Sequence, residues 1–317
     1  MSIRVGVVGA AGYVGSEMCR WILAHPDMTL SMAVSRSRVG KPLSSAVPAL
    51  LGATDVCFSG FDAAALCALD VVVLATPHGA AAGLAAQLGD APVLLDCSRD
   101  HRHAEGWVFG QPEWHADKLV GATRIAAPGC FATALMLSAA PFVDAGVVAG
   151  DIQVVAATGS TGSGASASAA THHPERFVNL KAYKVLNHQH VPEVLAFLAG
   201  LGTQPTLNFV PWSAPVDRGI FATSFIPMTP GCDADAIVRT AYGNRRFIRL
   251  RDGTPELRHV RGTAFCDISV HQDGDTAVVL AAMDNLGRGA AAQAMQALNL
   301  ALGLREDAAI GVFAATP

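Results

Sequence analysis

The chain has 317 residues, which is enough for two separate hydrophobic cores at the usual size of a domain. Its 22 Lys and Arg residues stand against 26 Asp and Glu residues, a formal net charge of −4, which argues against nucleic acid or an anionic membrane surface as the main partner. Only 15% of the residues are charged and 51% are hydrophobic, so a disordered chain is excluded and a compact α/β protein is expected.

A membrane span is the first alternative to exclude, because residues 125–143 carry no charge. Pro128, Gly129 and Pro141 interrupt this stretch, and a helix that starts after Gly129 and stops near Pro141 is too short to cross a bilayer. The first four residues run directly into a predicted strand, which argues against a signal peptide. The seven cysteines are scattered without a C-x-x-C pair, so we expect a cytoplasmic protein with neither disulfides nor a zinc site.

A glycine-rich turn separates a predicted strand at residues 3–8 from a predicted helix at residues 13–23. In this order, glycines let the backbone approach a pyrophosphate and the free amides at the helix start attract its charge. The spacing is G-x-x-G-x-x-G rather than G-x-G-x-x-G, so a tight turn that needs glycine only for its conformation remains the alternative. The predicted cofactor contacts in this turn are Gly9, Ala11, Gly12, Tyr13, Val14 and Gly15.

The residues after the second predicted strand, 29–34, indicate which dinucleotide is bound. An NAD enzyme usually has an Asp or Glu there to accept a hydrogen bond from the ribose. This chain has Ser35, Arg36, Ser37 and Arg38 instead. Hydroxyl and guanidinium groups suit a 2′-phosphate, which a carboxylate would repel, so the sequence favours NADP(H) over NAD. A solvated basic loop is the alternative.

Two further buried parallel strands are expected at residues 70–75 and 93–96, because both runs are largely apolar without alternation. In a doubly wound sheet, ligands bind outside the carboxyl ends of the strands. We therefore expect Pro77 and His78, after one strand, and Ser98, after the other, to face the nicotinamide side of the cofactor. For His78 a structural role, such as capping the next helix, is an equal alternative.

Cys130 is the candidate nucleophile, because it opens a predicted helix at residues 130–140 directly after a Pro-Gly pair. A thiol in the first turn of a helix faces unpaired amides and the positive end of the dipole, which favour the thiolate. The dipole contributes only about 1 kcal/mol, less than one unit of thiol pKa, so a nearby cation is needed as well.

The candidate cations are His188 and His190, which would point the same way if this segment is extended. An imidazole can stabilise a thiolate and then transfer protons. Two histidines at this spacing also suit a metal, but no third ligand is apparent.

A loop of glycine and hydroxyl residues, 158–164, follows a predicted strand at residues 151–157. Its backbone amides could bind a phosphoryl group, or it could be a flexible linker. The candidate substrate-binding residues in it are Ser160, Thr161 and Gly162.

Taken in order, these motifs resemble the N-acetyl-γ-glutamyl-phosphate reductase family, the acyl-phosphate reductases of arginine biosynthesis. This family is related to aspartate-semialdehyde dehydrogenase and similar in plan to glyceraldehyde-3-phosphate dehydrogenase. The ordered set is specific and runs along nearly the whole chain. Its members are residues 9–15, 35–38, 77–79, 109–113, 128–130, 182–185, 188–193, 218–219, 284–286 and 289–293.

The resemblance implies a Rossmann NADP-binding domain at residues 1–129 and an α+β catalytic domain with a mainly antiparallel sheet at residues 130–285. A C-terminal helix, within residues 286–317, would return to the first domain. Three predicted strands between residues 220 and 283 have no long helix between them, in agreement with an antiparallel sheet. Relatives of this kind are commonly dimers or tetramers, so a homo-oligomer is expected.

The resemblance also implies NADPH-dependent reduction of a small-molecule acyl phosphate, N-acetyl-γ-glutamyl phosphate, through a thioester on Cys130. His190, with His188 as the second choice, would be the acid and base. Arg218 would hold the substrate carboxylate, the loop after the strand at 151–157 would hold the leaving phosphate, and Asn285 would contact the cofactor. No metal is needed for this chemistry.

Some residues depart from the family pattern. Ala127 and Phe131 stand where the family usually has Asn and Tyr, and residues 165–168 lack its usual Arg-Lys pair. Residues 171–176 resemble a branch that reduces acyl phosphates attached to a small acidic carrier protein, in lysine or archaeal-type arginine synthesis. A basic rim for such a carrier would come from His172, His173, Arg176, Lys181 and Lys184. A carrier-linked substrate is thus the first alternative function, and a non-catalytic NADP-binding sensor is the second.

Overall fold

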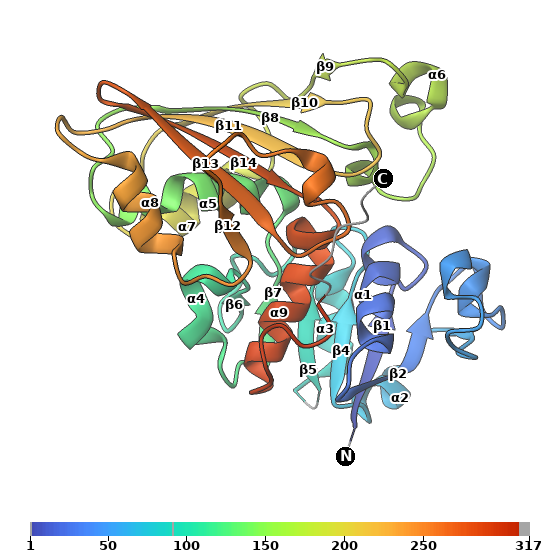
Figure 1. Ribbon diagram of the computed structural model, residues 1–317. Coiled ribbons are helices and arrows are strands. Elements are labelled where there is room, and N and C mark those ends of the chain that lie inside the picture. The colour runs from blue at the N-terminus through green and yellow to red at the C-terminus, as the bar shows by residue number, and fades with distance from the viewer. Residues whose placement is uncertain (1, 91, 311–317) are drawn as a thin grey trace. The chain divides into compact units, whose positions relative to one another are not determined.

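The computed structural model describes residues 2–90 and 92–310, so the last seven residues of the predicted C-terminal segment lie outside the described part of the chain. The chain divides into two compact units (Figure 1). The first comprises the residues up to Pro128 together with Ala290–Ile310, and the second comprises Gly129–Gly289. Within the described residues, no helix has both the length and the apolar composition that crossing a membrane requires.

The first unit is built on a seven-stranded parallel sheet with the strand order β3-β2-β1-β4-β5-β7-β6. Its central strands are apolar runs buried on both faces, as parallel sheets require. The order reverses between β1 and β4, the position where doubly wound folds bind their ligands. The strands are β1 (Ile3–Val8), β2 (Met28–Val34), β3 (Phe58–Ser59), β4 (Val71–Leu74), β5 (Val93–Asp96), β6 (Val108–Phe109) and β7 (Arg124–Ala126).

Five α-helices accompany this sheet, and one of them comes from the far end of the chain. Helix α9 packs against α1 and α4, as Figure 1 shows for the red helix beside the blue one. The Gln293 side chain of α9 donates to the Gly110 carbonyl at 3.2 Å. The helices are α1 (Tyr13–Leu23), α2 (Ala63–Cys67), α3 (Ala81–Leu88), α4 (Pro112–Leu119) and α9 (Ala292–Ala301).

The second unit is a seven-stranded mixed sheet with the order β12-β13-β14-β11-β8-β10-β9. Its neighbouring strands are antiparallel except for the pairs β8–β10 and β12–β13. The predicted α/β fold, a Rossmann sheet plus a mainly antiparallel sheet, is thereby confirmed. The strands are β8 (Ile152–Thr158), β9 (Lys181–Ala182), β10 (Leu207–Ser213), β11 (Ile220–Pro227), β12 (Ile248–Leu250), β13 (Cys266–Asp273) and β14 (Thr276–Met283).

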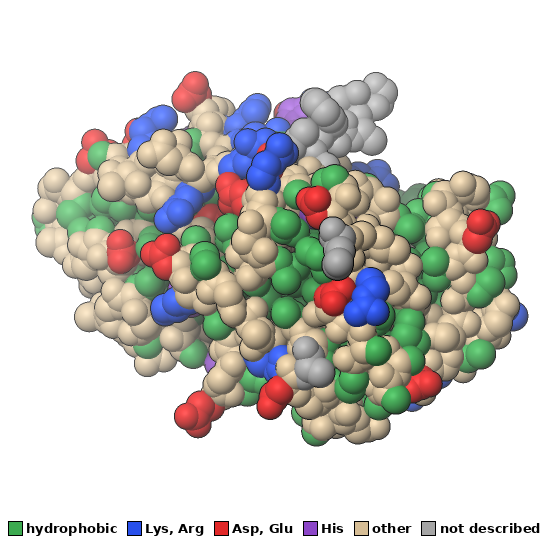
Figure 2. Space-filling view, turned by 90° about the horizontal axis from the view of Figure 1, so that it is seen from below, with side chains coloured by type: hydrophobic (Ala, Val, Ile, Leu, Met, Phe, Trp, Pro, Cys, Tyr) green, Lys and Arg blue, Asp and Glu red, His purple; other side chains and the backbone are tan. Residues whose placement is uncertain are grey.

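Helices α5 (Cys130–Asp144), α7 (Val191–Ala199) and α8 (Ala234–Tyr242) cover one face of this sheet (Figure 1). The short helix α6 (His173–Arg176) belongs to the segment between β8 and β9. On the molecular face in Figure 2, Lys and Arg side chains lie among Asp and Glu side chains. Exposed pairs such as Arg258 with Glu256, at 2.8 Å, show the same mixing of charges.

Helix α5 does not stop near Pro141 as the sequence predicted, but continues to Asp144. A proline inside a helix has no N–H to donate, so the carbonyl four residues earlier, that of Leu137, loses its helical partner. The buried hydroxyl of Tyr242 donates to this carbonyl at 2.8 Å. The prediction was wrong because the replacement donor lies 105 residues further along the chain.

Candidate active site

The glycine turn of the first unit has two positions without room for a side chain and one with open space. Gly9 has φ +87°, and a Cβ on it would lie 2.8 Å from the carbonyl carbon of Ala75. A Cβ on Gly15 would lie 2.8 Å from the carbonyl carbon of Gly9. A Cβ on Gly12 would make only one ordinary contact, at 3.4 Å. Gly12 is the N-cap of α1, whose first amides have no acceptor within the helix, so this open space suits a pyrophosphate.

The other predicted cofactor contacts in this region differ in exposure. Ala11 and Val14 are half-buried in the turn and Tyr13 is exposed. Ser35 is buried directly after β2, where its N–H donates to the Ser59 carbonyl at 3.0 Å.

Of the basic residues after β2, Arg38 donates to the Ser45 carbonyl at 2.8 Å. Arg36 and Ser37 are exposed, so both side chains are accessible to a ligand.

His78, next to the exposed Pro77, contacts the loop after β5 and does not cap the next helix, and its contact with the cofactor stays a prediction. Its Nδ1 accepts from the Arg99 N–H at 3.2 Å, and burial together with the charges of Arg102 and Arg99 lowers its pKa. The cap of α3 comes from Asp100, whose carboxylate accepts from backbone amides at 2.7 and 2.9 Å. The sequence analysis missed Asp100, although an acidic residue is a common N-terminal cap.

Ser98 is almost fully buried at the end of β5, and its hydroxyl already has two partners. It donates to the buried Asp96 at 3.0 Å and accepts from the Asp100 N–H at 3.1 Å. The ring of His101 also contacts Asp96, at 2.7 Å. Ser98 therefore orders the loop after β5, and its contact with the nicotinamide stays a prediction.

Cys130 and His190 come together in the second unit through the starts of two helices. Cys130 is the first residue of α5 and Gly129 is its N-cap. A Cβ on Gly129 would lie 2.7 Å from the imidazole carbons Cδ2 and Cε1 of His190, so the ring packs directly on this glycine. The N–H of Gly129 donates to the buried carboxylate of Glu193, in the first turn of α7, at 2.8 Å. On another side, a Cβ on Gly289 would lie 2.9 Å from Cβ of Cys130.

The segment that holds the two histidines is a turn rather than the extended piece considered from the sequence. His190 is helical in conformation at the start of α7, and its N–H donates to Nδ1 of His188 at 3.2 Å. The two rings are still neighbours, with centroids 4.8 Å apart. Burial, with a smaller contribution from the Lys184 charge, lowers the pKa of His188 to about 4. His188 is therefore neutral at pH 7 and cannot be the cation that the thiolate needs.

Three of the other six cysteines compete poorly with Cys130 as nucleophiles because their thiols are buried. Burial raises the pKa of Cys19 and of Cys97 to about 12, so both thiols stay protonated at neutral pH. Cys266 is also buried, whereas Cys130 is partly exposed. In the described ranges, no three His, Cys, Asp or Glu side chains are grouped as a metal site would require.

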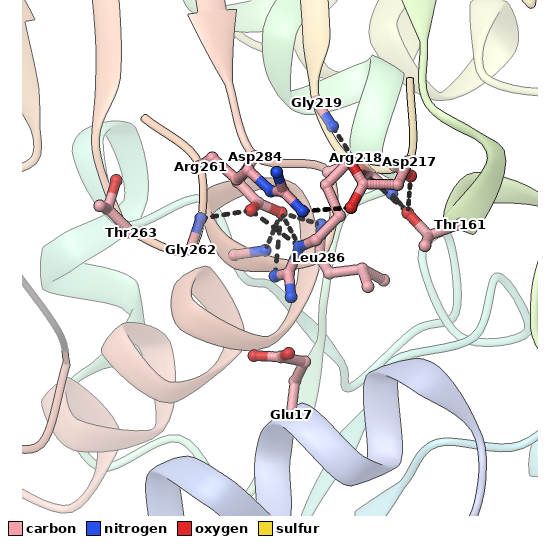
Figure 3. A network of polar contacts seen from close by, with 12 residues as sticks. Glu17, Thr161, Asp217, Arg218, Gly219, Arg261, Gly262, Thr263, Asp284 and Leu286 are labelled. Carbon is pink, nitrogen blue, oxygen red and sulfur yellow. Dashed lines mark hydrogen bonds and ion pairs between the residues drawn. The ribbon is translucent and has the colours of Figure 1, made fainter. Parts of the chain in front are cut away.

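A buried carboxylate fixes the guanidinium of Arg218 (Figure 3). Asp284 is fully buried and accepts from Nε of Arg218 at 2.9 Å and from Nη2 at 3.1 Å. A two-bond arrangement of this kind orients the planar guanidinium. The same carboxylate also accepts from the backbone amides of Gly262, Leu286 and Gly287. The sequence analysis gave Asp284 no role, although this single acid directly follows an apolar strand.

The Asn285 side chain makes hydrogen bonds within the second unit. Its Oδ1 accepts from the Gly219 N–H at 2.8 Å, and its Nδ2 donates to Oγ1 of Thr161 at 3.0 Å. The side chain thus connects the 158–164 loop to the start of β11. The predicted contact between Asn285 and the cofactor stays a prediction.

The 158–164 loop is an ordered turn in which the amides of Gly159, Ser160, Thr161 and Gly162 already donate to carbonyls. It contains a 3-10 turn at Ser160–Ser163, so it is not a flexible linker. Phosphate binding through its amides, as considered from the sequence, also does not fit, because these groups have carbonyl partners within 3.2 Å. The donors and their acceptors are Gly159 to Gly219, Ser160 to Val216, Thr161 to Asp217 and Gly162 to Gly159.

Two protein-family models match the chain, one over each unit. The semialdehyde dehydrogenase NAD binding domain matches residues 4–122, and the semialdehyde dehydrogenase dimerisation domain matches residues 130–285. The chain thus belongs to the class of semialdehyde dehydrogenases.

Curated relatives give the particular family. N-acetyl-gamma-glutamyl-phosphate reductase from Salinispora arenicola is 37% identical over the full length of both chains, and that from Frankia casuarinae is 39% identical over 98% of each. The chain belongs to the N-acetyl-γ-glutamyl-phosphate reductase family, which confirms the resemblance carried by its motifs.

Solved structures agree at the level of the fold alone. Aspartate semialdehyde dehydrogenase II from Vibrio cholerae has a TM-score of 0.78 at 18% identity, over 96% of this chain and 99% of the other. Aspartate semialdehyde dehydrogenase with NADP from Candida albicans has a TM-score of 0.69 at 14% identity, over 95% and 100%.

Proposed function

We propose that this chain reduces N-acetyl-γ-glutamyl phosphate to N-acetylglutamate semialdehyde with NADPH and releases inorganic phosphate, as a step of arginine biosynthesis. The observation that carries the proposal is the junction of two helix starts. Cys130 opens α5, and the ring of His190 packs on the glycine directly before it. A helix N-terminus and a neighbouring imidazolium are the two features that favour a thiolate.

In the first step, the thiolate of Cys130 attacks the acyl carbon of the substrate. The C–S bond forms and the C–O bond to phosphate breaks, with its electron pair leaving on the phosphate oxygen. The proton of the His190 imidazolium goes to the departing phosphate. The Glu193 contact with Gly129 supports this step, because it holds the starts of α5 and α7 together.

Bound NADPH would supply the hydride that reduces the thioester. The tetrahedral alkoxide on the Cys130 sulfur then collapses to the aldehyde. The C–S bond breaks with its electron pair returning to sulfur, and His190 takes up a proton from solvent. This restores the starting ion pair.

Different residues would bind the substrate and the cofactor. Arg218, oriented by Asp284, would bind the substrate carboxylate. Preference for NADP(H) is supported by the exposed Arg36 and Ser37 and by the hydroxyl and cationic residues after β2, where an NAD enzyme has an acid. A homo-oligomer is supported by the dimerisation-domain match over the second unit.

The test is the reverse reaction, in which NADPH formation is followed with N-acetylglutamate semialdehyde, NADP⁺ and phosphate. We expect Cys130→Ser to lower kcat by at least about 1,000-fold, because the thioester cannot form. Iodoacetamide should label Cys130, and the acyl phosphate should protect it. Full turnover by Cys130→Ser would overturn the covalent mechanism, and NADP binding without turnover by the unmodified protein would favour the sensor. Activity only on a carrier-linked semialdehyde would favour the other substrate class.

A further inference from the structure

Arg176 has a polar atom that the described chain leaves without a partner. It ends α6, in a segment that the sequence analysis assigned to a solvent-facing rim. Its guanidinium turns inward instead, and Nη2 donates to the Thr158 carbonyl at 3.1 Å. Its Nε is buried and has no hydrogen-bond partner among the described residues. Burial also lowers the pKa of Arg176 from its usual value, although an arginine remains charged at neutral pH.

Thr158, which contacts Arg176, has a second such atom. The residue is only 6% exposed, and its Oγ1 is buried without a hydrogen-bond partner among the described residues. A Cβ on Gly162 would lie 3.3 Å from this oxygen and 4.0 Å from Nδ2 of Asn285. A side chain at position 162 would therefore press on this hydroxyl. Buried polar groups are rarely left unpaired, so two adjacent ones indicate a ligand that pairs with them.

The ring of Tyr183 lies beside that of His188. Burial and the negative charge of Cys130 raise the pKa of the Tyr183 phenol to about 12, and the positive charge of Arg176 opposes this rise. The Tyr183 ring lies 5.9 Å from that of His188, between centroids, and so belongs to the surroundings of the catalytic pair.

We propose that Arg176 and Thr158 bind the phosphoryl group of the acyl phosphate. This inference rests on the proposed function. A guanidinium suits phosphate oxygens, and a hydroxyl adds a further donor. Two other candidates in the second unit have different roles: four amides of the 158–164 loop donate to carbonyls, and Arg218 is assigned to the substrate carboxylate.

The position suits the chemistry of the first step. When the C–O bond breaks, its electron pair leaves with the phosphate, so negative charge grows on the group that Arg176 contacts. A preformed cation at that place stabilises the transition state. In the reverse direction, the same site binds inorganic phosphate for attack on the thioester.

The experiment measures the KM for phosphate in the reverse reaction. We expect Arg176→Gln to raise it about 10- to 100-fold, with the KM for the semialdehyde changed less than about twofold, as for loss of charged hydrogen bonds. The KM for phosphate of Arg176→Lys should lie between those of the unmodified protein and Arg176→Gln, because lysine keeps the charge but lacks the planar guanidinium. Thr158→Val, which keeps the shape, should raise the KM for phosphate about threefold to tenfold. Arg245→Gln, which removes an exposed cation of the same unit, should leave both KM values unchanged.

A burst experiment separates this inference from the proposed function. Semialdehyde and NADP⁺ without phosphate should give one NADPH for each active site, as the thioester accumulates. Absence of this burst in the unmodified protein would overturn the proposed function. A normal burst in Arg176→Gln, with an unchanged KM for phosphate, would overturn the phosphate site alone. If Arg176→Gln does not fold, as judged by circular dichroism, the same two readouts on Thr158→Val decide the question.

Discussion

The chain contains two glycine-rich loops that look alike in sequence and differ in what they leave free. In the first, residues 9–15, two glycines allow a close backbone approach, and the helix that follows has amides without helical acceptors. In the second, residues 158–164, the loop itself forms a single 3-10 turn, and the amides of Gly159, Ser160, Thr161 and Gly162 donate to carbonyls of the chain. The polar atoms left over there belong to the side chains of Thr158 and Arg176.

Glycine and hydroxyl content does not by itself define an anion site. The deciding property is whether the backbone N–H groups of the loop are already hydrogen-bonded within the chain. A long helix after the turn leaves its first amides to a ligand, whereas a turn folded against a neighbouring segment uses its own amides. In the second loop the chain therefore has to supply an anion with side-chain donors.

Among substitutions in the two loops, we expect the largest loss of stability at Gly15, in the first loop. Gly15→Ala places a Cβ within 2.9 Å of backbone atoms that cannot move aside, so we expect the first unit to lose about 3 kcal/mol of stability and to bind NADP(H) far more weakly. Thermal unfolding and cofactor titration measure the two effects. Gly83→Ala, inside α3 with no atom within 4 Å of the new Cβ, should be neutral or slightly stabilising. An equally stable Gly15→Ala would mean that the turn is not packed as described.

A somewhat smaller effect is expected at Asn285, which holds the second loop in place. Asn285→Ala leaves the Gly219 N–H and the Thr161 hydroxyl without this partner, at a cost of about 2 kcal/mol in the free energy of unfolding. The KM for phosphate should rise because the loop loosens, while the affinity for NADP(H) stays near that of the unmodified protein. Asn244→Ala, at an exposed position, should change stability by less than about 0.5 kcal/mol. Weaker NADP(H) binding at unchanged stability would instead support the cofactor role predicted from the sequence.

Much of the fold could be predicted because its signals are local. Strand β1 and helix α1 have the predicted bounds, since an apolar run, a glycine turn and a helical period follow one another within about twenty residues. The position of Cys130 at the start of a helix is equally local. Helix α5 was predicted too short because the donor that satisfies the Leu137 carbonyl, Tyr242, lies far away in sequence.

The errors at the site have the same origin. Which side chain of a polar pair binds a ligand and which only supports its neighbour depends on contacts between distant segments. Asn285 reaches Thr161 across 124 positions, and Asp284 reaches Arg218 across 66. Arg176 stood among residues predicted to face solvent, and only its bond to the Thr158 carbonyl shows that it turns inward.

The smallest expected change in stability, and the sharpest test of the second loop, is at Gly162. Gly162→Ala does not require a left-handed backbone, so the free energy of unfolding should change by less than about 1 kcal/mol. The new methyl group would lie 3.3 Å from Oγ1 of Thr158, a tight contact that would displace this hydroxyl, so the KM for phosphate should rise several-fold.

Gly164→Ala is the matched control in the same loop, and it should give the opposite pattern. Its φ of +82° strains any side chain, whereas no atom lies within 4 Å of the new Cβ. It should therefore lose about 1 kcal/mol of stability and keep the KM for phosphate. If both variants kept the KM for phosphate, the Thr158 hydroxyl would not bind phosphate, and the second loop would serve only to hold β8 and β11 together.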